Sequence, residues 1–543
     1  MLTCIAGGRV VDPTTARDAI GDVWLQDERV VEPPADGRAD RRIDAHGHVV
    51  MAGAIEVHSH IAGGNVILSR LLLPELQVDE GGPLPGVTGS AGAIGEAYAR
   101  MGYTTAIEPA LAPTNALATH LELADIPFLD RGALSVLGND DQLLALLRNR
   151  ESSEAVRDLV ALTLATSRGL GVKVVNAGGA VAFKEGAIRF GLDDEVPAYG
   201  LTSRHILQAL LDAVEELGVP HPLHVHCSNL GLPGADETLI QTLAAAEGRR
   251  IHFAHAQFYA YAEAEPGAVS SGFRSAAERF AAAVAENPNA TMDVGQVVFG
   301  QTCTLSLDVI RQFGGRKAAS PRKWALVAGD AEGGGLVPFR YRRAGATSAL
   351  QFAIGLELML LSPDPERILL TTDHPNGGPF TAYPRILHLL MDREERDREL
   401  ATLPRAVAER SSVGRLEREY TLSEVAAMTR SGPARLLGLD DRGHLRPGAR
   451  ADVAVYRDLP DRTAMFSAAA HVLKGGRTIV ENGEVVDWQA GRTLSLSLGA
   501  DPGMKRRADA YLETRFGTGL SGFAVPEAAF PGREVFSEVA CRS

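Results

Sequence analysis

The chain of 543 residues carries a formal net charge of −14 at pH 7, with 45% hydrophobic and 22% charged residues. This acidic balance argues against nucleic acid as the principal partner, and the mixed composition excludes a fibrous or disordered protein. Because no apolar run is long enough to cross a membrane and no secretory leader is visible, we expect a cytoplasmic protein without membrane association. Four scattered cysteines do not make a disulfide framework, so reduced buried thiols are expected at Cys4, Cys227, Cys303 and Cys541.

The two ends of the chain predict one small β domain. Residues 1–52 alternate short β-like runs with turn signals, which is typical of a small sheet. Residues 441–500 supply similar runs, and Asn482-Gly483 between two β-branched pairs favours a two-residue hairpin turn. We therefore expect a composite β-sandwich built from both termini, followed by a C-terminal extension over 501–543 that begins with a short helix.

Residues 53–440 alternate strand candidates with helix candidates, a pattern that predicts parallel strands joined by crossover helices. Clear helical stretches occupy 152–169, 203–218 and 274–287, and the second has Ser203 as its candidate N-cap. Because there are eight strand candidates, we expect an α/β fold of the TIM-like (β/α)8 barrel type. The expected strands are 54–58, 104–108, 133–137, 172–175, 223–227, 251–255, 290–294 and 368–372.

Two segments fit this alternation less well. Residues 61–100 contain a Gly/Pro-rich stretch, and residues 300–350 contain a second irregular stretch. Long loops of a barrel enzyme commonly face the substrate, so we expect both segments to form loops above the barrel.

Metal-binding residue types end five of the apolar runs. In barrel enzymes the carboxyl ends of the strands form the active site. His58 and His60 are two residues apart, so on an extended strand both rings point to one face and can hold one ion together. The five runs are AIEVHSH (54–60), GVKVV (171–175), PLHVHC (222–227), RIHFAH (250–255) and RILLTTD (367–373).

This residue set favours a two-metal hydrolytic site, in which paired divalent ions activate a water molecule and polarise a carbonyl. We expect zinc, because its usual ligands are nitrogen and oxygen atoms of these residue types. His58, His60 and Asp373 would hold one ion, and His226 and His255 the second.

Lys173 is the candidate bridge between the two ions. It lies in an apolar run, and burial lowers the pKa of a lysine until the neutral amine is accessible. A neutral amine can capture carbon dioxide as a carbamate, N6-carboxylysine, whose oxygens can bridge two cations. The ordinary alternatives are a solvated lysine, hydrogen-bonded core histidines and an aspartate that caps a turn. Each alternative is ordinary for a single residue, but all of them together would require candidate ligands to occur by chance at five of eight strand ends. This makes the metal site the better interpretation.

Some residues close to the candidate ligands in the sequence could also be ligands. His224 and His226 share one face of their strand, and we favour His226 as the ligand because it is nearer the carboxyl end. Cys227 should face away from His226 and pack behind the site. We expect His252, three residues before His255, to be structural.

Eight stretches distributed along the chain carry a family resemblance: AGAIEVHSHIAGG (52–64), MGYTTAIEPA (101–110), GVKVVNAGG (171–179), HPLHVHCSNLGLPG (221–234), HAQFYAY (255–261), MDVGQV (292–297), GGGLVPF (333–339) and TTDHPNGGPFTAYPR (371–385). With them the chain resembles the amidohydrolase superfamily. Within it, the chain is similar to the A subunits of formylmethanofuran dehydrogenases and of bacterial formyltransferase/hydrolase complexes.

The resemblance implies hydrolysis of the formyl amide of formylmethanofuran, or of a methylofuran analogue, to formate and free amine in one-carbon oxidation. An activated water would attack the formyl carbon, and Asp373 would pass its proton to the leaving amine. The resemblance also implies a formyltransferase and further subunits as partners. The Ala- and Arg-rich composition favours the bacterial complex. Substrate-binding residues are expected at Asn229, His374 and Arg340.

Other functions share parts of this pattern. A tungsten or molybdenum formylmethanofuran dehydrogenase complex would use a similar A subunit. A cyclic amidase of the hydantoinase or dihydropyrimidinase kind would share every metal ligand. A metal-free scaffold subunit is the alternative outside the enzymes, and retention of all six candidate ligands argues against it.

Overall fold

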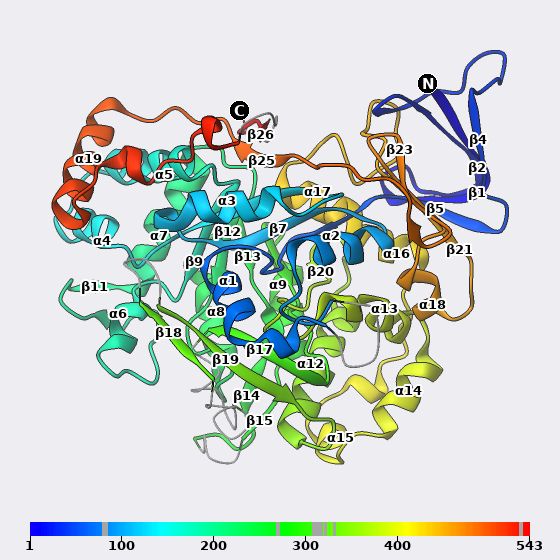
Figure 1. Ribbon diagram of the computed structural model, residues 1–543. Helices are drawn as coiled ribbons and strands as arrows, with labels where there is room; N and C mark the ends of the chain where they lie inside the picture. Colours follow the sequence, from blue (N-terminus) through cyan, green and yellow to red (C-terminus); the bar gives the residue numbers. More distant parts are fainter. Residues whose placement is uncertain are drawn as a thin grey trace.

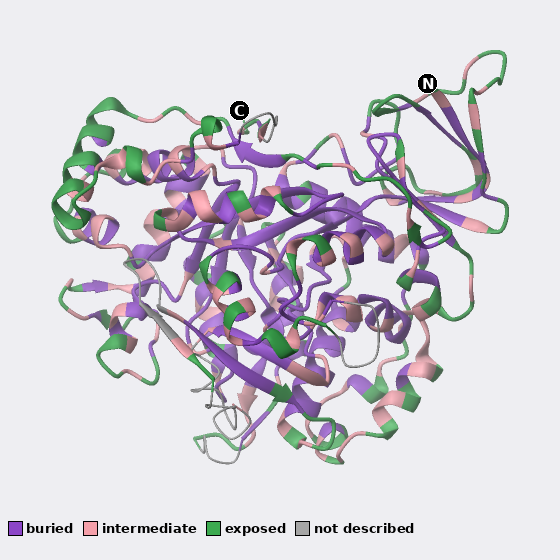
Figure 2. Cartoon of the chain, in the orientation of Figure 1, coloured by how far each residue is buried: buried purple, intermediate pink, exposed green. Residues whose placement is uncertain are grey.

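The computed structural model describes residues 1–78, 85–267, 272–306, 319, 323–328, 333–530 and 536–542. Parts of the two segments expected to be loops, including 79–84 and 307–318, lie outside the described residues. A central barrel carries helices around it, and a separate sheet lies at the upper right, where the blue N-terminal segment meets an orange segment from later in the chain (Figure 1). Buried residues concentrate in the barrel strands and in the helix faces turned toward them (Figure 2).

The expected barrel is confirmed. Each strand pairs in parallel with the next, and an isolated parallel bridge between Ser59 and His374 joins the first strand region to the last. The backbone amide of His60 donates to the carbonyl of His374 at 2.7 Å, beside this bridge. The carboxyl ends of all eight strands therefore meet at one rim. The strands are β6 (Ala54–Glu56), β7 (Tyr103–Leu111), β8 (Asp130–Leu137), β9 (Gly171–Val175), β12 (Leu223–His226), β13 (Ile251–Phe253), β16 (Ala290–Asp293) and β20 (Ile368–Leu369).

The three expected helices are present as α5 (Ser153–Ser167), α7 (Ser203–Glu216) and α9 (Ala277–Glu286). The expected N-cap of α7 is wrong by one residue. The hydroxyl of Thr202, not of Ser203, accepts the backbone amide of His205 at 3.2 Å, because Thr202 is the residue that still has an extended backbone.

Among the described residues no helix is long and apolar enough to cross a membrane. The structure contains further helices outside the barrel strands. They are α1 (Gly64–Leu72), α2 (Ala91–Arg100), α3 (Ala116–Ala124), α4 (Asp141–Arg148), α6 (Gly179–Lys184), α8 (Ala235–Ala245), α12 (Ala346–Leu361), α13 (Tyr383–Met391), α14 (Arg393–Ala401), α15 (Ala406–Arg410), α16 (Leu422–Ala426), α17 (Gly432–Leu437), α18 (Arg462–Ser467) and α19 (Pro502–Phe516).

The two expected loops contain regular structure, which corrects that prediction. Residues 61–100 form α1 and α2, and residues 300–350 contain a three-stranded sheet of β17 (Gly300–Ser306), β18 (Ala325–Ala328) and β19 (Gly333–Tyr341), here called the lobe. The lobe and α1 bury a small apolar core of their own, and this shared burial stabilises both. That core consists of Val66, Leu73, Val87, Cys303, Leu305 and Leu336.

The composite domain of both termini is also confirmed, as a nine-stranded sheet. Its two halves meet where β5 pairs antiparallel with β21. The predicted hairpin turn joins β23 to β24, with Asn482 at φ +52° and Gly483 at φ +81°, values typical of a type I′ turn. The strands are β1 (Leu2–Asp12), β2 (Arg17–Gln26), β3 (Arg29–Val31), β4 (Arg41–Asp44), β5 (His48–Ala52), β21 (Val453–Arg457), β22 (His471–Lys474), β23 (Arg477–Glu481) and β24 (Glu484–Val485).

The C-terminal extension returns to the barrel. After β25 (Thr493–Leu496) and the expected helix α19, the chain forms β26 (Phe536–Val539), and β25 lies between β26 and the first residues of β8. Two antiparallel pairs complete the structure: β10 (Glu195–Val196) with β11 (Leu201–Thr202), and β14 (Tyr261–Glu263) with β15 (Phe273–Ser275).

A buried ionic cluster joins the composite sheet to the barrel. The carboxylate of Asp130, at the first residue of β8, accepts hydrogen bonds from Lys474 Nζ and Arg442 Nη1, both at 2.8 Å. Lys474 also donates to Asp452 at 2.6 Å. Burial alone would raise the pKa of Asp130, but Lys474 and Arg442 hold it well below its usual range. The cluster therefore fixes the composite sheet against the end of the barrel that lies away from the rim.

Replacing Asp130 with asparagine should lower the free energy of unfolding by about 3–5 kcal/mol, because it leaves buried cations without their counter-charge. The measurement is the shift of the urea unfolding midpoint. The control is Asp18→Asn, which breaks an exposed pair with Arg9 and should cost no more than about 1 kcal/mol. Equal effects of the two substitutions would contradict a structural role for the cluster.

Candidate metal centre

A cavity of about 820 Å³ opens at the rim of the barrel. Five of the six residues expected as ligands line it, and the sixth, His58, is fully buried behind them. The five are His60, Lys173, His226, His255 and Asp373. Residues from five strand ends thus meet at one place, as the sequence predicts.

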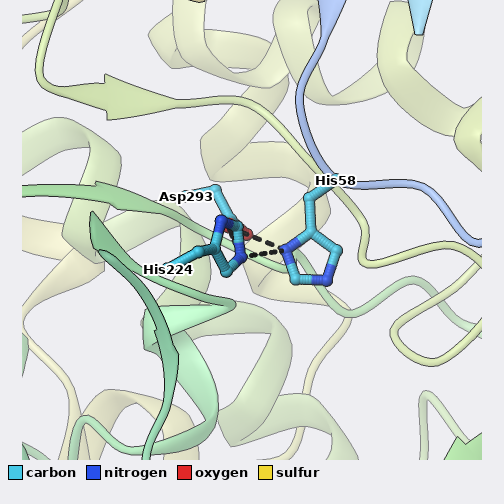
Figure 3. Close-up of side chains that lie close together, drawn as sticks. All are labelled: His58, His224 and Asp293. Carbon is cyan, nitrogen blue, oxygen red and sulfur yellow. Dashed lines mark hydrogen bonds and ion pairs between the residues drawn. The ribbon is translucent and has the colours of Figure 1, made fainter. Parts of the chain in front are cut away.

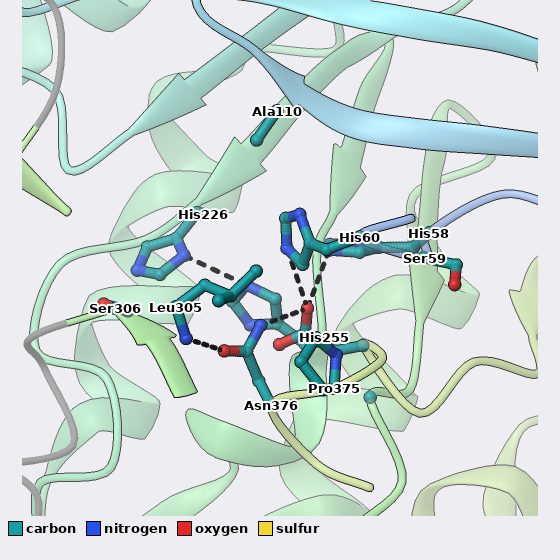
Figure 4. Close-up of polar contacts among 12 residues, drawn as sticks. His58, Ser59, His60, Ala110, His226, His255, Leu305, Ser306, Pro375 and Asn376 are labelled. Carbon is teal, nitrogen blue, oxygen red and sulfur yellow. Dashed lines mark hydrogen bonds and ion pairs between the residues drawn. The ribbon is translucent and has the colours of Figure 1, made fainter. Parts of the chain in front are cut away.

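Asp373 connects the first and last strand regions. Its Oδ1 atom lies 3.1 Å from Nε2 of His58 and 3.3 Å from Nε2 of His60 (Figure 4). Both histidines follow the end of β6 and are not on the extended strand expected for them. They nevertheless reach the same oxygen, because the backbone bends after Glu56 and pairs again at Ser59.

His226 and His255 form the second pair. Nε2 of His255 lies 3.0 Å from Nδ1 of His226, with the two rings nearly perpendicular. His255 has φ +35°, and the neighbouring Gly295 must be glycine, since a Cβ at that position would lie 2.3 Å from the Cβ of His255. His58, His255 and Asp373 each offer a ligand atom within 4.8 Å of the others, so the two pairs adjoin.

Lys173 is buried on β9, with 2% of its surface exposed, and its side chain borders the cavity. Burial lowers the pKa of Lys173 to about 8, although Asp373, Asp293 and Glu108 act in the opposite direction. The neutral amine required for carbamate formation is therefore accessible near neutral pH.

These residues fit a cation. Nδ1 of His255 is a buried ring nitrogen without a hydrogen-bond partner among the described residues, which is unusual for a buried polar atom, and Nε2 of His58 faces Oδ1 of Asp373. Burial also lowers the pKa of His255 well below its usual value, so the ring is neutral and can act as a ligand. Nitrogen and carboxylate donors of this kind suit zinc.

Asp293, at the end of β16, supports the histidines from behind. Its carboxylate accepts from Nδ1 of His58 at 2.9 Å (Figure 3). Two more bonds to it come from Nε2 of His252 at 3.1 Å and from the hydroxyl of Thr371 at 2.7 Å. It also accepts the backbone amide of His255 at 2.9 Å. Histidines that bind a metal usually give their other ring nitrogen to such a carboxylate.

His58, His224 and Asp293 also lie close enough together to hold an ion. The hydrogen bonds favour a supporting role instead. Nδ1 of His58 is already paired with Asp293, whereas its Nε2 faces Asp373 on the cavity side. His224 lies behind His58, with its Nε2 3.2 Å from Nδ1 of His58.

Glu108, on β7, holds His60 in the same way. Its Oε1 lies 2.9 Å from Nδ1 of His60, and its Oε2 accepts the backbone amides of Ile61 and Ala62. Burial works to lower the pKa of His60, but Glu108 and Asp373 overcome it and raise that pKa to about 9. Without a cation, His60 therefore keeps its proton at neutral pH.

Sequence reasoning missed Asp293 and Glu108. Both lie in stretches that carry the family resemblance, MDVGQV and MGYTTAIEPA, and both come at or near the end of a barrel strand. Their position at or near a strand end was the sequence feature that could have identified them as residues of the site. His252, expected to be structural, contacts Asp293 and Thr291, and Cys227 is buried beside the strand.

The three expected substrate-binding residues are not among the described residues that line the cavity. The side chain of Asn229 is bonded to the backbone of Phe190 and to the hydroxyl of Thr238, so its amide is used within the protein. Arg340 is exposed on β19. His374 is buried, and burial lowers its pKa to about 3.

The chain is similar to known proteins. An amidohydrolase family model matches residues 41–480. The Fhc A subunit of the formyltransferase/hydrolase complex of Methylorubrum extorquens is 67% identical, and the alignment covers 100% of both chains. The protein FwdA of Methanocaldococcus jannaschii is 36% identical over 90% of both chains.

A solved structure also matches along the whole chain. It is the crystal structure of the formyltransferase/hydrolase complex FhcABCD from Methylorubrum extorquens in complex with methylofuran. The matching chain has 67% sequence identity and a TM-score of 0.96, with 100% of both chains covered.

Replacing Asp293 with asparagine should weaken zinc binding by about 10–100-fold, the usual effect of losing a carboxylate that supports histidine ligands. Competition with a chelator measures this affinity on the purified chain. The control, Thr371→Val, removes one hydrogen bond to the same carboxylate but leaves its bond to His58. Unchanged affinity in Asp293→Asn would contradict the supporting role.

Zinc binding near pH 7.5 should release protons, because His60, with its pKa raised to about 9, must lose its proton to become a ligand. The affinity for zinc should therefore rise with pH up to about 9. Calorimetry in two buffers of different ionisation enthalpy measures the release. Glu108→Gln removes the charge that raises the pKa of His60 and should reduce the release; an identical release would refute this assignment.

Proposed function

Because the chain belongs to the amidohydrolase family, we propose that it hydrolyses the formyl amide of a formylated methanofuran-type carrier, such as a methylofuran, to formate and free amine. In this proposal it is the A subunit of a formyltransferase/hydrolase complex in the cytoplasm, and a formyltransferase subunit supplies its substrate. The observation that supports it best is the meeting of His60, Lys173, His226, His255 and Asp373 in one cavity, with His58 directly behind. The full-length similarity to the Fhc A subunit supports the choice of substrate.

Two zinc ions, held by the histidines and Asp373 and bridged by carboxylated Lys173, would lower the pKa of a water molecule and polarise the formyl carbonyl. The residues around them have separate tasks. Asp293 and Glu108 fix the rings of His58 and His60, so these ligands are oriented before substrate arrives.

Asp373 is the residue proposed to move the proton. Burial would raise its pKa, but His255 and His58 hold that pKa well below its usual range, so the carboxylate is ionised at neutral pH. It can therefore accept a proton from the attacking water and deliver it to the nitrogen of the leaving amine. A formamide needs this delivery because an unprotonated amine is a poor leaving group.

The cavity offers two kinds of wall to the rest of the substrate. Helix α1 contributes apolar lining residues, including Ile67 and Leu71, and Asn139 and Asn176 contribute polar ones. Mostly apolar walls with a few polar groups are typical of small-molecule sites. A ring joined to a formamide matches this arrangement.

The direct test is formate release by the purified complex from a formylated methylofuran. Lys173→Ala should lose more than about 100-fold in kcat, beyond the effect expected for a supporting residue. Lys323→Ala, an exposed lysine paired with Glu75, is the matched control and should keep full activity. Mass spectrometry should find carbon dioxide added at Lys173 alone.

Other results would select the alternatives. Turnover of a hydantoin with none of the formylated carrier would identify a cyclic amidase. Co-purification with a tungsten or molybdenum subunit, in place of a formyltransferase, would identify a dehydrogenase complex. Less than about one zinc per chain after mild purification, with no turnover, would indicate a scaffold.

A further inference from the structure

Asn376 bonds to Asp373 and to the lobe at the same time. Its Nδ2 donates to Oδ1 of Asp373 at 2.9 Å, and its Oδ1 accepts the backbone amide of Leu305 at 2.7 Å (Figure 4). The side chain also lines the cavity. The backbone amide of Leu305 can only donate, so the amide oxygen of Asn376 must face it and the NH2 group must face Asp373.

The lobe holds this segment at further points. The hydroxyl of Thr302 donates to the carbonyl of Pro375, and the hydroxyl of Tyr341 donates to the carbonyl of Asn376 at 3.2 Å. Leu305 itself is buried in the small core between the lobe and α1. One part of the lobe packs against α1 and another part, including Val337 and Phe339, packs into the main core, and its edge is bonded to the residues that follow Asp373.

We propose that Asn376 is a positioning residue that sets the rotation of the Asp373 carboxylate. This inference rests on the proposed hydrolase function. The carboxylate is flat and can turn about its last bond, but Asn376 adds a third contact to the oxygen that already faces His58 and His60. Oδ1 is thereby kept on the side of the histidines, and Oδ2 is left for the proton of the attacking water.

A simple turn-forming role does not account for these contacts. The turn after Asp373 is closed by the backbone, since the amide of Asn376 donates to the carbonyl of Asp373 at 2.6 Å. The side chain is not needed for that bond. Its two ends are instead used to link a buried carboxylate to a strand about 70 residues earlier in the chain, and a side chain with only one kind of hydrogen-bonding group cannot make both contacts.

Two substitutions separate the two bonds of Asn376. Asn376→Ala removes both, whereas Asn376→Asp keeps an acceptor for Leu305 and removes the donor to Asp373. We expect Asn376→Asp to lower kcat for the formylated methylofuran by about 10–100-fold with KM unchanged, because proton transfer and not substrate binding is affected. Asn376→Ala should also weaken zinc binding by about 10–100-fold in chelator competition on the full chain.

Thr302→Val is the matched control. It removes a bond between the lobe and Pro375 but touches neither Asn376 nor Asp373, so kcat and zinc affinity should stay at the wild-type values. The inference is overturned if Asn376→Asp keeps the wild-type kcat, or if Thr302→Val loses as much as Asn376→Ala. Weaker zinc binding by Asn376→Ala, in a chain whose wild type does not release formate, would support the positioning role and refute the proposed substrate.

Discussion

A buried polar atom needs a partner, and this requirement governs the rim of the barrel. Several imidazoles, a lysine and the carboxylates of Glu108, Asp293 and Asp373 are withdrawn from water within one cluster. Most of their polar atoms are paired. The carboxylate of Asp293 is hydrogen-bonded to His58 and His252, and the carboxylate of Glu108 is hydrogen-bonded to His60. Among the described residues, Nδ1 of the cavity-lining His255 is left without a partner, and a cation bound nearby would complete the set.

Stability and chemistry are placed at opposite ends of the barrel. The charged cluster of Asp130, Lys474 and Arg442 joins the composite sheet to the beginning of β8, far along the strand from the rim. At the rim, the lobe and α1 form a separate small core and close one side of the cavity. The rim can therefore hold strained residues, such as His255 and Asp373 with positive φ, because the rest of the barrel is fixed elsewhere.

The barrel could be predicted because its strands are short β-branched runs buried on both faces. Such runs can be recognised in the sequence without knowing which strands they pair with. The meeting of Lys173, His226 and Asp373 followed from that prediction, since parallel strands bring their carboxyl ends to one rim. The lobe and α1 could not be predicted, because their burial depends on contacts between segments far apart in the sequence and glycine-rich sequence surrounds them. Asp293 was missed because a single carboxylate at a strand end has the same local sequence whether it faces a histidine or solvent. Asn229 and His374 were expected to contact substrate, His374 because it adjoins Asp373, but position in the sequence does not show the direction of a side chain.

The most direct measurement is anomalous diffraction at the zinc edge from crystals of the purified protein. Two zinc peaks are expected: one beside Nε2 of His58 and His60 and Oδ1 of Asp373, and one beside His226 and His255. Density for a carboxylate on the amine of Lys173 should lie between them. A cavity without zinc peaks, with an unmodified Lys173 amine paired to Asp373, would contradict this expectation.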